Sequence, residues 1–128
     1  MADTNKQFDQ VTAKCRRIFI DKMQDYGPSW RIFRLHGITD QLYIKACNIR
    51  QRQESGVSLV GDDIEGNLRA IVNYGVTAII QSRNGYADAI DMTNERATQL
   101  YDEVLQEAKD LMLRKNHDYG EAWREMSK

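Results

Sequence analysis

Apolar side chains recur at three- and four-residue spacing along most of the chain, which is the period of an amphipathic α-helix. The pattern predicts long helices over residues 4–25, 39–55, 62–82 and 93–119, and a short helix directly after Pro28. The helix over 62–82 is the most apolar and is expected to lie at the centre of the fold. Because no segment alternates apolar and polar residues over the length of a strand, the chain is predicted to be all-α, a helical bundle.

Glycine and proline mark the expected ends of these helices. Gly27 and Pro28 end the first helix, because glycine adopts the left-handed conformation common at helix ends and proline cannot continue the hydrogen bonding. Gly37 is expected to end the short helix, and Thr39 or Asp40 to cap the next one.

The apolar stripes also predict which helix faces are buried. On the helix over 39–55 the stripe comprises Leu42, Ala46, Cys47 and Ile49. On the helix over 62–82 it comprises Ile64, Leu68, Ile71, Val72, Gly75, Ala78 and Ile79. Gly75 either permits the close approach of another helix or is a tolerated weak point. Cys15 and Cys47 both fall on apolar stripes, so we expect small core residues and no disulfide.

A ten-residue pattern at the end of the first helix returns near the C-terminus. Residues 22–31 and 115–124 both read K-x-x-D-Y-G-x-x-W-R, and the two copies lie 93 residues apart. The same shift superimposes the apolar positions upstream: Phe8, Val11, Cys15, Ile18 and Phe19 fall on Tyr101, Val104, Ala108, Leu111 and Met112. We therefore predict an internal repeat, with a first unit over 1–92 and an incomplete second unit over 93–128 that packs on the first or on another subunit.

Charge and composition exclude several classes of protein. The 128 residues carry a net charge of −1, so no basic excess marks a general nucleic-acid binder, and direct nucleic-acid binding is not expected. No apolar run reaches membrane-spanning length, and the N-terminus has no signal-peptide pattern. The expected location is the cytoplasm, without a membrane partner.

The repeated motif has two interpretations. In the structural one, Asp25 caps the following short helix, Trp30 fills the core and Arg31 pairs with a carboxylate. In the functional one, Tyr26 and Trp30 are faces able to stack a base, while Lys22 and Arg31 neutralise phosphate, arginine in a bidentate manner. Duplication would copy a structural turn as readily as a binding site, so the repeat does not decide between them.

Acidic residues gather where the third long helix begins. Asp62, Asp63 and Glu65 could hold a Mg²⁺ ion against the phosphates of a nucleotide. Alternatively, acids are common in a first helical turn because the helix dipole favours them. Asn73 lies beside the apolar stripe two turns later and needs a partner, which is either another helix or a ligand.

The order of three segments, DYGPSWR, ITDQLYIKACNIR and GDDIEG…IVNYG, resembles the family called nucleotide modification associated domain 1. This domain of unknown function occurs in bacteria and phages and is often duplicated. The resemblance covers residues 18–81, and its start is repeated at 111–126. The family is in turn distantly similar to the all-α MazG-type pyrophosphohydrolases, which hydrolyse nucleoside triphosphates with Mg²⁺ held by two acidic pairs on adjacent helices.

The sequence departs from that enzyme pattern on the helix over 39–55, which carries Lys45 and Arg52 where an acidic pair would lie. A basic helix opposite one acidic helix fits nucleotide binding better than hydrolysis. The resemblance therefore implies a protein that binds a nucleotide or a phosphorylated metabolite, with Mg²⁺-dependent pyrophosphohydrolase activity left open. The alternative is a non-catalytic helical assembly module. In either case we expect a homo-oligomer, because the last helix carries a full apolar stripe that must be buried.

Overall fold

The computed structural model describes residues 3–56 and 62–119. Its elements are, in chain order, α1 (Thr4–Tyr26), the 3-10 helix η1 (Ser29–Ile32), α2 (Leu35–Ser55), α3 (Asp62–Asn84) and α4 (Asn94–Tyr119). No strand occurs in these two stretches, so the prediction of an all-α fold is confirmed. None of the helices so described has the length and apolarity needed to cross a bilayer.

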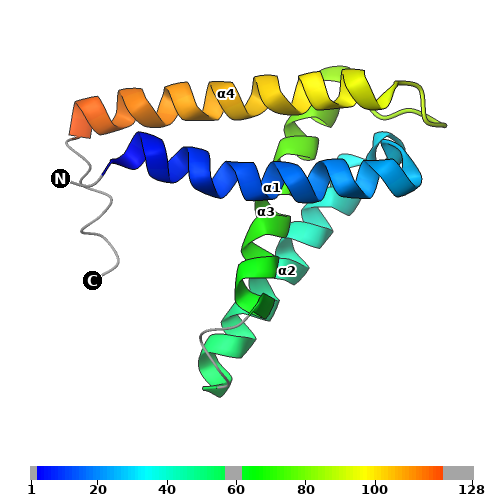
Figure 1. Ribbon diagram of the computed structural model, residues 1–128. Helices are drawn as coiled ribbons and strands as arrows, with labels where there is room; N and C mark the ends of the chain where they lie inside the picture. The colour runs from blue at the N-terminus through cyan, green and yellow to red at the C-terminus, as the bar shows by residue number, and fades with distance from the viewer. Residues whose placement is uncertain (1–2, 57–61, 120–128) are drawn as a thin grey trace.

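The helices form two antiparallel pairs that cross each other (Figure 1). α1 and α4 run side by side in opposite directions, and the ion pairs Arg16–Asp102 and Lys109–Asp9 connect them at the surface. α2 and α3 run side by side in opposite directions; the start of α2 and the end of α3 pack against the α1–α4 pair, whereas the end of α2 and the start of α3 project away from it (Figure 1). α3 contacts each of the other three α-helices, which confirms that it is the central helix.

The core lies where the C-terminal half of α3 meets α1, η1 and α4. Phe19 stacks on Tyr101 with ring centroids 4.3 Å apart, and Trp30 packs against the other side of this group at 6.0 Å from Phe19. The remaining buried members of this cluster are Met23, Val76, Ile80, Ala97 and Val104. The predicted stripes of the first and last helices therefore supply half of this cluster, whereas Val11, Ala108 and Leu111 of the same stripes are exposed.

Gly27 ends α1 as predicted. Its φ angle of 66° lies in the region that favours glycine, and its N–H donates to the carbonyl of Met23 at 2.7 Å. The chain then passes through Pro28 into η1, and Asp3 caps the other end of α1 by accepting from the N–H of Lys6.

The predicted start of the next helix is wrong, because α2 begins before Gly37 and contains both Thr39 and Asp40. Thr39 does not cap it, since its Oγ1 donates to a carbonyl one turn earlier within the helix. The break lies instead at Phe33, which is extended and whose carbonyl accepts a hydrogen bond from Nε2 of Gln81 in α3. This tertiary contact, and not the glycine, sets the end of η1.

The predicted buried face of α2 is also wrong. Cys47 and Ala46 are exposed, and the only buried residue of α2 is Ile38, in its second turn. Leu42 and Ile49 are half-buried against α3. α2 packs on α3 alone along most of its length, so it has one covered side and no second layer above it.

α3 turns a different face to the core from the one predicted. Val76, Thr77, Ile80 and Gln81 are buried, whereas Leu68 and Ile79 of the predicted stripe are 50% and 40% exposed. A Cβ added to Gly75 would meet no atom within 4 Å, so this glycine does not serve a close approach within the chain. The other five residues of the predicted stripe are half-buried, so the stripe is only partly covered.

Candidate functional site

A cavity of about 400 Å³ lies between α1, α3 and η1. Residues of α1 at three- and four-residue spacing form one wall, and residues of α3 at the same spacing form the other, since such residues share a helix face. The wall from α1 contains Ile18, Phe19, Lys22, Met23 and Tyr26. The wall from α3 contains Gly66, Arg69, Ala70, Asn73, Tyr74 and Thr77, and Gly27, Ser29 and Trp30 close the end.

Aromatic side chains make the closed end of this cavity rigid. Phe19 and Trp30 are buried in the core and also line the cavity, so its deep wall is part of the packed interior. The Nε1 atom of Trp30 is enclosed and has no hydrogen-bond partner among the described residues. Two further rings, Tyr26 and Tyr74, stand nearer the surface, with Tyr26 73% exposed.

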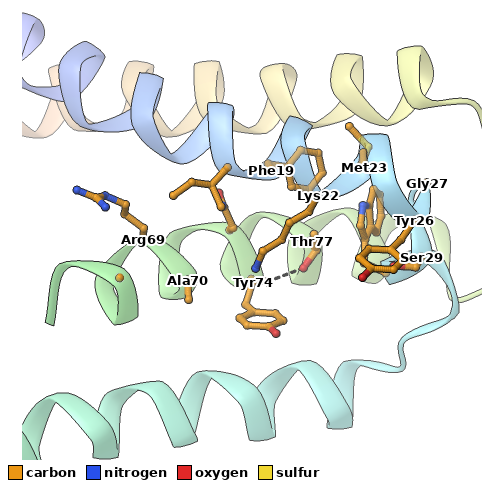
Figure 2. A pocket seen from close by; sticks show the side chains of 14 residues that line it. Phe19, Lys22, Met23, Tyr26, Gly27, Ser29, Arg69, Ala70, Tyr74 and Thr77 are labelled. Atoms are coloured by element: carbon orange, nitrogen blue, oxygen red, sulfur yellow. Dashed lines mark hydrogen bonds between the residues drawn. The ribbon is translucent and has the colours of Figure 1, made fainter. Parts of the chain in front are cut away.

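Among the residues that the structure describes, the two charged groups in the lining, Lys22 and Arg69, are both positive. Figure 2 shows Lys22 extending from α1 toward α3, with Arg69 at the far end of the cavity. Arg69 donates one guanidinium N–H to Glu65 at 2.9 Å, and among the described residues its other N–H groups have no partner and can bind a ligand. The cavity therefore favours an anionic or neutral molecule over a cationic one.

Arg31 does not line this cavity, and its side chain is buried. Its guanidinium donates to both carboxylate oxygens of Asp91, at 2.9 and 3.2 Å, to the carbonyl of Gly85 at 2.5 Å and to Oε1 of Gln81. Hydrogen bonds from Arg31 lower the pKa of the Asp91 carboxyl. These contacts agree with the structural interpretation, in which Arg31 pairs with a carboxylate, and leave it turned away from the cavity.

Asn73 lines the cavity but both ends of its amide are engaged inside the protein. Its Nδ2 donates to the carbonyl of Cys15 at 3.0 Å, and its Oδ1 accepts from the hydroxyl of Tyr101 at 2.7 Å. Burial raises the pKa of both the Tyr101 hydroxyl and the Cys15 thiol. Of the two partners expected for Asn73, the structure shows the one from neighbouring helices.

Three other predicted binding residues lie away from the cavity. Asp25 is exposed, and η1 begins without a side-chain cap, so the capping role expected for Asp25 is wrong. Lys45 is half-buried on α2, and Arg52 lines a separate hollow with Asn48 of the same helix. The structure thus brings Lys22, Tyr26, Trp30 and Asn73 together and separates them from Asp25, Arg31, Lys45 and Arg52.

The predicted metal ligands are only partly described. The side chains of Asp62 and Asp63 lie outside the described residues, whereas Glu65 is exposed and paired with Arg69. No group of three His, Cys, Asp or Glu residues converges among the side chains that the structure describes. A Mg²⁺ site at this end of α3 therefore stays a prediction.

Apart from Asn73, sequence reasoning missed the α3 side of the cavity. Gly66, Ala70 and Tyr74 follow one another at four-residue spacing, and Arg69 stands beside them. The two small residues Gly66 and Ala70, in line with Tyr74, could have indicated a hollow on this face. The prediction instead took the more apolar stripe on the opposite side of α3 as the important face.

Residues 22–82 match the family described as nucleotide modification associated domain 1. The matched segment begins at Lys22 and runs through α2 and α3, so it includes every cavity residue except Ile18 and Phe19. The resemblance to this family is confirmed over these residues, while the similarity to MazG-type enzymes and the duplication stay predictions. No curated protein and no solved structure matches the chain.

Proposed function

Since residues 22–82 carry a nucleotide modification associated domain 1, we propose that the cavity between α1 and α3 binds a nucleotide or another phosphorylated small molecule. The observation that supports this most is the composition of the lining: apolar and aromatic walls with two cations, Lys22 and Arg69. Its volume of about 400 Å³ falls within the range of small-molecule sites, roughly 300–1,000 Å³.

Each part of a nucleotide has a matching group in the lining. A base is a flat apolar ring, and Tyr26, Tyr74 and Trp30 offer aromatic surface on which it can stack, worth about 1–3 kcal/mol per base. Phosphate needs cations and N–H donors, which Lys22 and the free donors of Arg69 supply. A sugar, which is polar on one edge and apolar on its faces, fits beside Ala70 and the hydroxyl of Thr77.

A more specific form of the proposal asks whether the site also binds Mg²⁺ and hydrolyses the nucleotide. Glu65 lies one turn before Arg69, so a Mg²⁺ ion held by Glu65 together with Asp62 or Asp63 would lie on the phosphate side of the ligand. α2 carries Lys45 and Arg52 in place of a second acidic pair. Because hydrolysis of the MazG type uses two such pairs, we favour binding over catalysis.

Filling the cavity tests the proposal directly. Ala70→Leu places a larger side chain in the space that the ligand would occupy, and we expect it to weaken nucleotide binding at least about tenfold, or 1.4 kcal/mol. Ala46→Leu makes the same change at an exposed position of α2 and should leave binding unaltered. Nucleotides would be screened by the shift of the unfolding temperature, with and without Mg²⁺, and the affinities then measured by calorimetry. Equal affinities of the wild type and Ala70→Leu would contradict the site.

The alternative function, a helical assembly module without a ligand, also has an observation in its favour. Large apolar side chains of the α2–α3 hairpin are exposed, among them Tyr43 at 71% and Leu68 at 50%. Exposed apolar surface of this kind is typical of protein–protein contacts. A protein that self-associates but whose unfolding temperature no nucleotide or phosphate shifts would fit this alternative.

A further inference from the structure

A second hollow of about 320 Å³ continues the same groove between α1 and α3. It is lined by Gln10, Val11, Lys14, Glu65, Leu68 and Arg69. Arg69 belongs to the lining of both hollows, so the two meet at its guanidinium. The first hollow is walled by aromatic rings, whereas Gln10, Lys14 and Arg69 give the second a high density of N–H donors.

The cations of the groove follow one another along a single direction. Lys14, Ile18 and Lys22 are spaced four residues apart on α1, so they share one helix face, and the two lysine Cα atoms are separated by roughly 12 Å along the axis. Arg69 reaches this groove from α3, opposite α1. A molecule that extends from the aromatic end therefore meets Lys22, then Arg69, and then Lys14.

We propose that the second hollow is the subsite for a polyphosphate tail, so that the preferred ligand is a nucleoside di- or triphosphate and not a monophosphate. The inference rests on the proposed function, because it takes the base to lie in the first hollow. Lys14 and Arg69 are the charged donors for the outer phosphates, and the amide of Gln10 is a neutral donor beside them. Val11 and Leu68 flank these groups, each about half exposed (56% and 50%).

Glu65 is the one acidic residue among the described residues of this lining, and it opposes a phosphate that arrives without a metal. Its carboxylate accepts from Arg69 at 2.9 Å, with 65% of the Glu65 side chain exposed, so solvent screens the pair. Removing the charge as Glu65→Gln should strengthen triphosphate binding in the presence of a chelator. If Glu65 instead shares a Mg²⁺ ion with the tail, the same variant weakens binding when Mg²⁺ is supplied.

Calorimetry with the mono- and triphosphate of one deoxynucleoside, in chelator, tests the subsite. The wild type should bind the triphosphate at least about tenfold more tightly than the monophosphate, because two further phosphates meet Lys14 and Arg69. Lys14→Ala should remove most of this preference and leave the monophosphate affinity unchanged. Lys6→Ala removes the same charge from an exposed position of α1 that lines neither hollow, and should preserve the preference.

The outcomes separate this inference from the function on which it rests. If the wild type binds both nucleotides with equal affinity, the cavity binds a nucleotide but the second hollow is not a phosphate subsite. If Lys14→Ala and Lys6→Ala weaken the triphosphate equally, the effect is general electrostatic attraction and the subsite is wrong. If neither nucleotide binds, the proposed function fails and this inference fails with it.

Discussion

Trp30 shows how one residue of the repeated motif takes part in both the core and the cavity. Its indole is 8% exposed and packs against Phe19, so it contributes to the hydrophobic core of the domain. The same ring lines the deep end of the cavity, where its Nε1 has no partner among the described residues. The structural and the functional interpretations of this residue are therefore compatible, because a binding wall that is part of the core is held rigid.

Substitutions at Trp30 should separate its packing from its polar group. Trp30→Ala is expected to lower the free energy of unfolding by about 3–5 kcal/mol, since it leaves a cavity in the core. Trp30→Phe should cost much less, because it keeps most of the ring and removes an unsatisfied donor whose burial costs about 1–3 kcal/mol. Urea unfolding measures both. A loss below about 1 kcal/mol for Trp30→Ala, together with lost ligand binding, would show that the ring acts only as a stacking surface.

For single residues, the sequence indicated which side chains have suitable chemistry for binding better than it indicated where those side chains point. Lys22, Tyr26 and Trp30 were predicted as binding residues, and the structure places all of them in one lining. Arg31 was grouped with them because it follows Trp30 directly, yet consecutive residues of a short helix point in different directions, and its guanidinium turns to Gln81 and Asp91. Spacing along the chain could not reveal this, because both partners of Arg31 lie at least 50 residues away.

At the scale of elements, a polar network joins η1 to the rest of the fold. The side-chain Nε2 of Gln81 in α3 donates to the backbone carbonyls of Arg31 and Phe33, and its side-chain Oε1 accepts from the Arg31 guanidinium. Arg31 in turn binds Gly85 and Asp91, which lie in the connection between α3 and α4. The network fixes η1, and with it Trp30, against the C-terminal half of α3.

This network makes stability depend on pH in a definite direction. Arg31 lowers the pKa of Asp91 in the folded protein, so the ion pair contributes fully above the ordinary aspartate pKa of about 3.9 and is lost as the pH falls through the lower, folded value. Asp91→Asn should therefore destabilise the protein at neutral pH, with the difference from the wild type shrinking in acid. Unfolding curves measured from pH 7 to below about pH 4 test this.

The exposed pair Arg83–Glu107 provides the control for that experiment. Its two side chains are 54% and 57% exposed, so solvent screens their attraction. Glu107→Gln should change the stability little at any pH. If Glu107→Gln and Asp91→Asn change the stability by the same amount at each pH, then pairing with the buried guanidinium of Arg31 gives Asp91 no larger effect on stability than an exposed ion pair has.

The helices were predictable from the sequence, but the faces they bury were only partly so. Apolar period identified all four long helices, and Cys15, Phe19 and Met23 are buried as expected on α1. On α3 the most apolar stripe was taken as the core face, whereas the structure buries Thr77 and Gln81 beside Val76 and Ile80. Buried Gln81 is stable because its amide is fully hydrogen-bonded, and a pattern of apolar positions cannot detect a polar residue satisfied by distant partners.

At the scale of the whole molecule, the fold changes the argument for self-association. The prediction of an oligomer rested on the apolar stripe of the last helix, and the structure buries Tyr101 and Val104 of that stripe against helices of the same chain. Leu111 of that stripe is still 49% exposed, and a second exposed apolar surface lies on α3. There Leu68 and Ile79 are exposed, and Val72 and Gly75, which share their helix face, are half-buried. Open space above Gly75 leaves room for another helix to approach.

We therefore predict that the protein self-associates through this face of α3. Sedimentation should show a dimer or a larger species for the wild type, and Ile79→Glu should weaken association at least about tenfold, because it places a charge in an apolar contact. Leu113→Glu is the matched control: Leu113 of α4 is 39% exposed against 40% for Ile79, and its replacement should leave association intact. The opposite result, with Leu113→Glu disrupting and Ile79→Glu not, would move the interface to α4. A strict monomer at high concentration would remove self-association from the account and leave the apolar face of α3 without a function in the isolated chain.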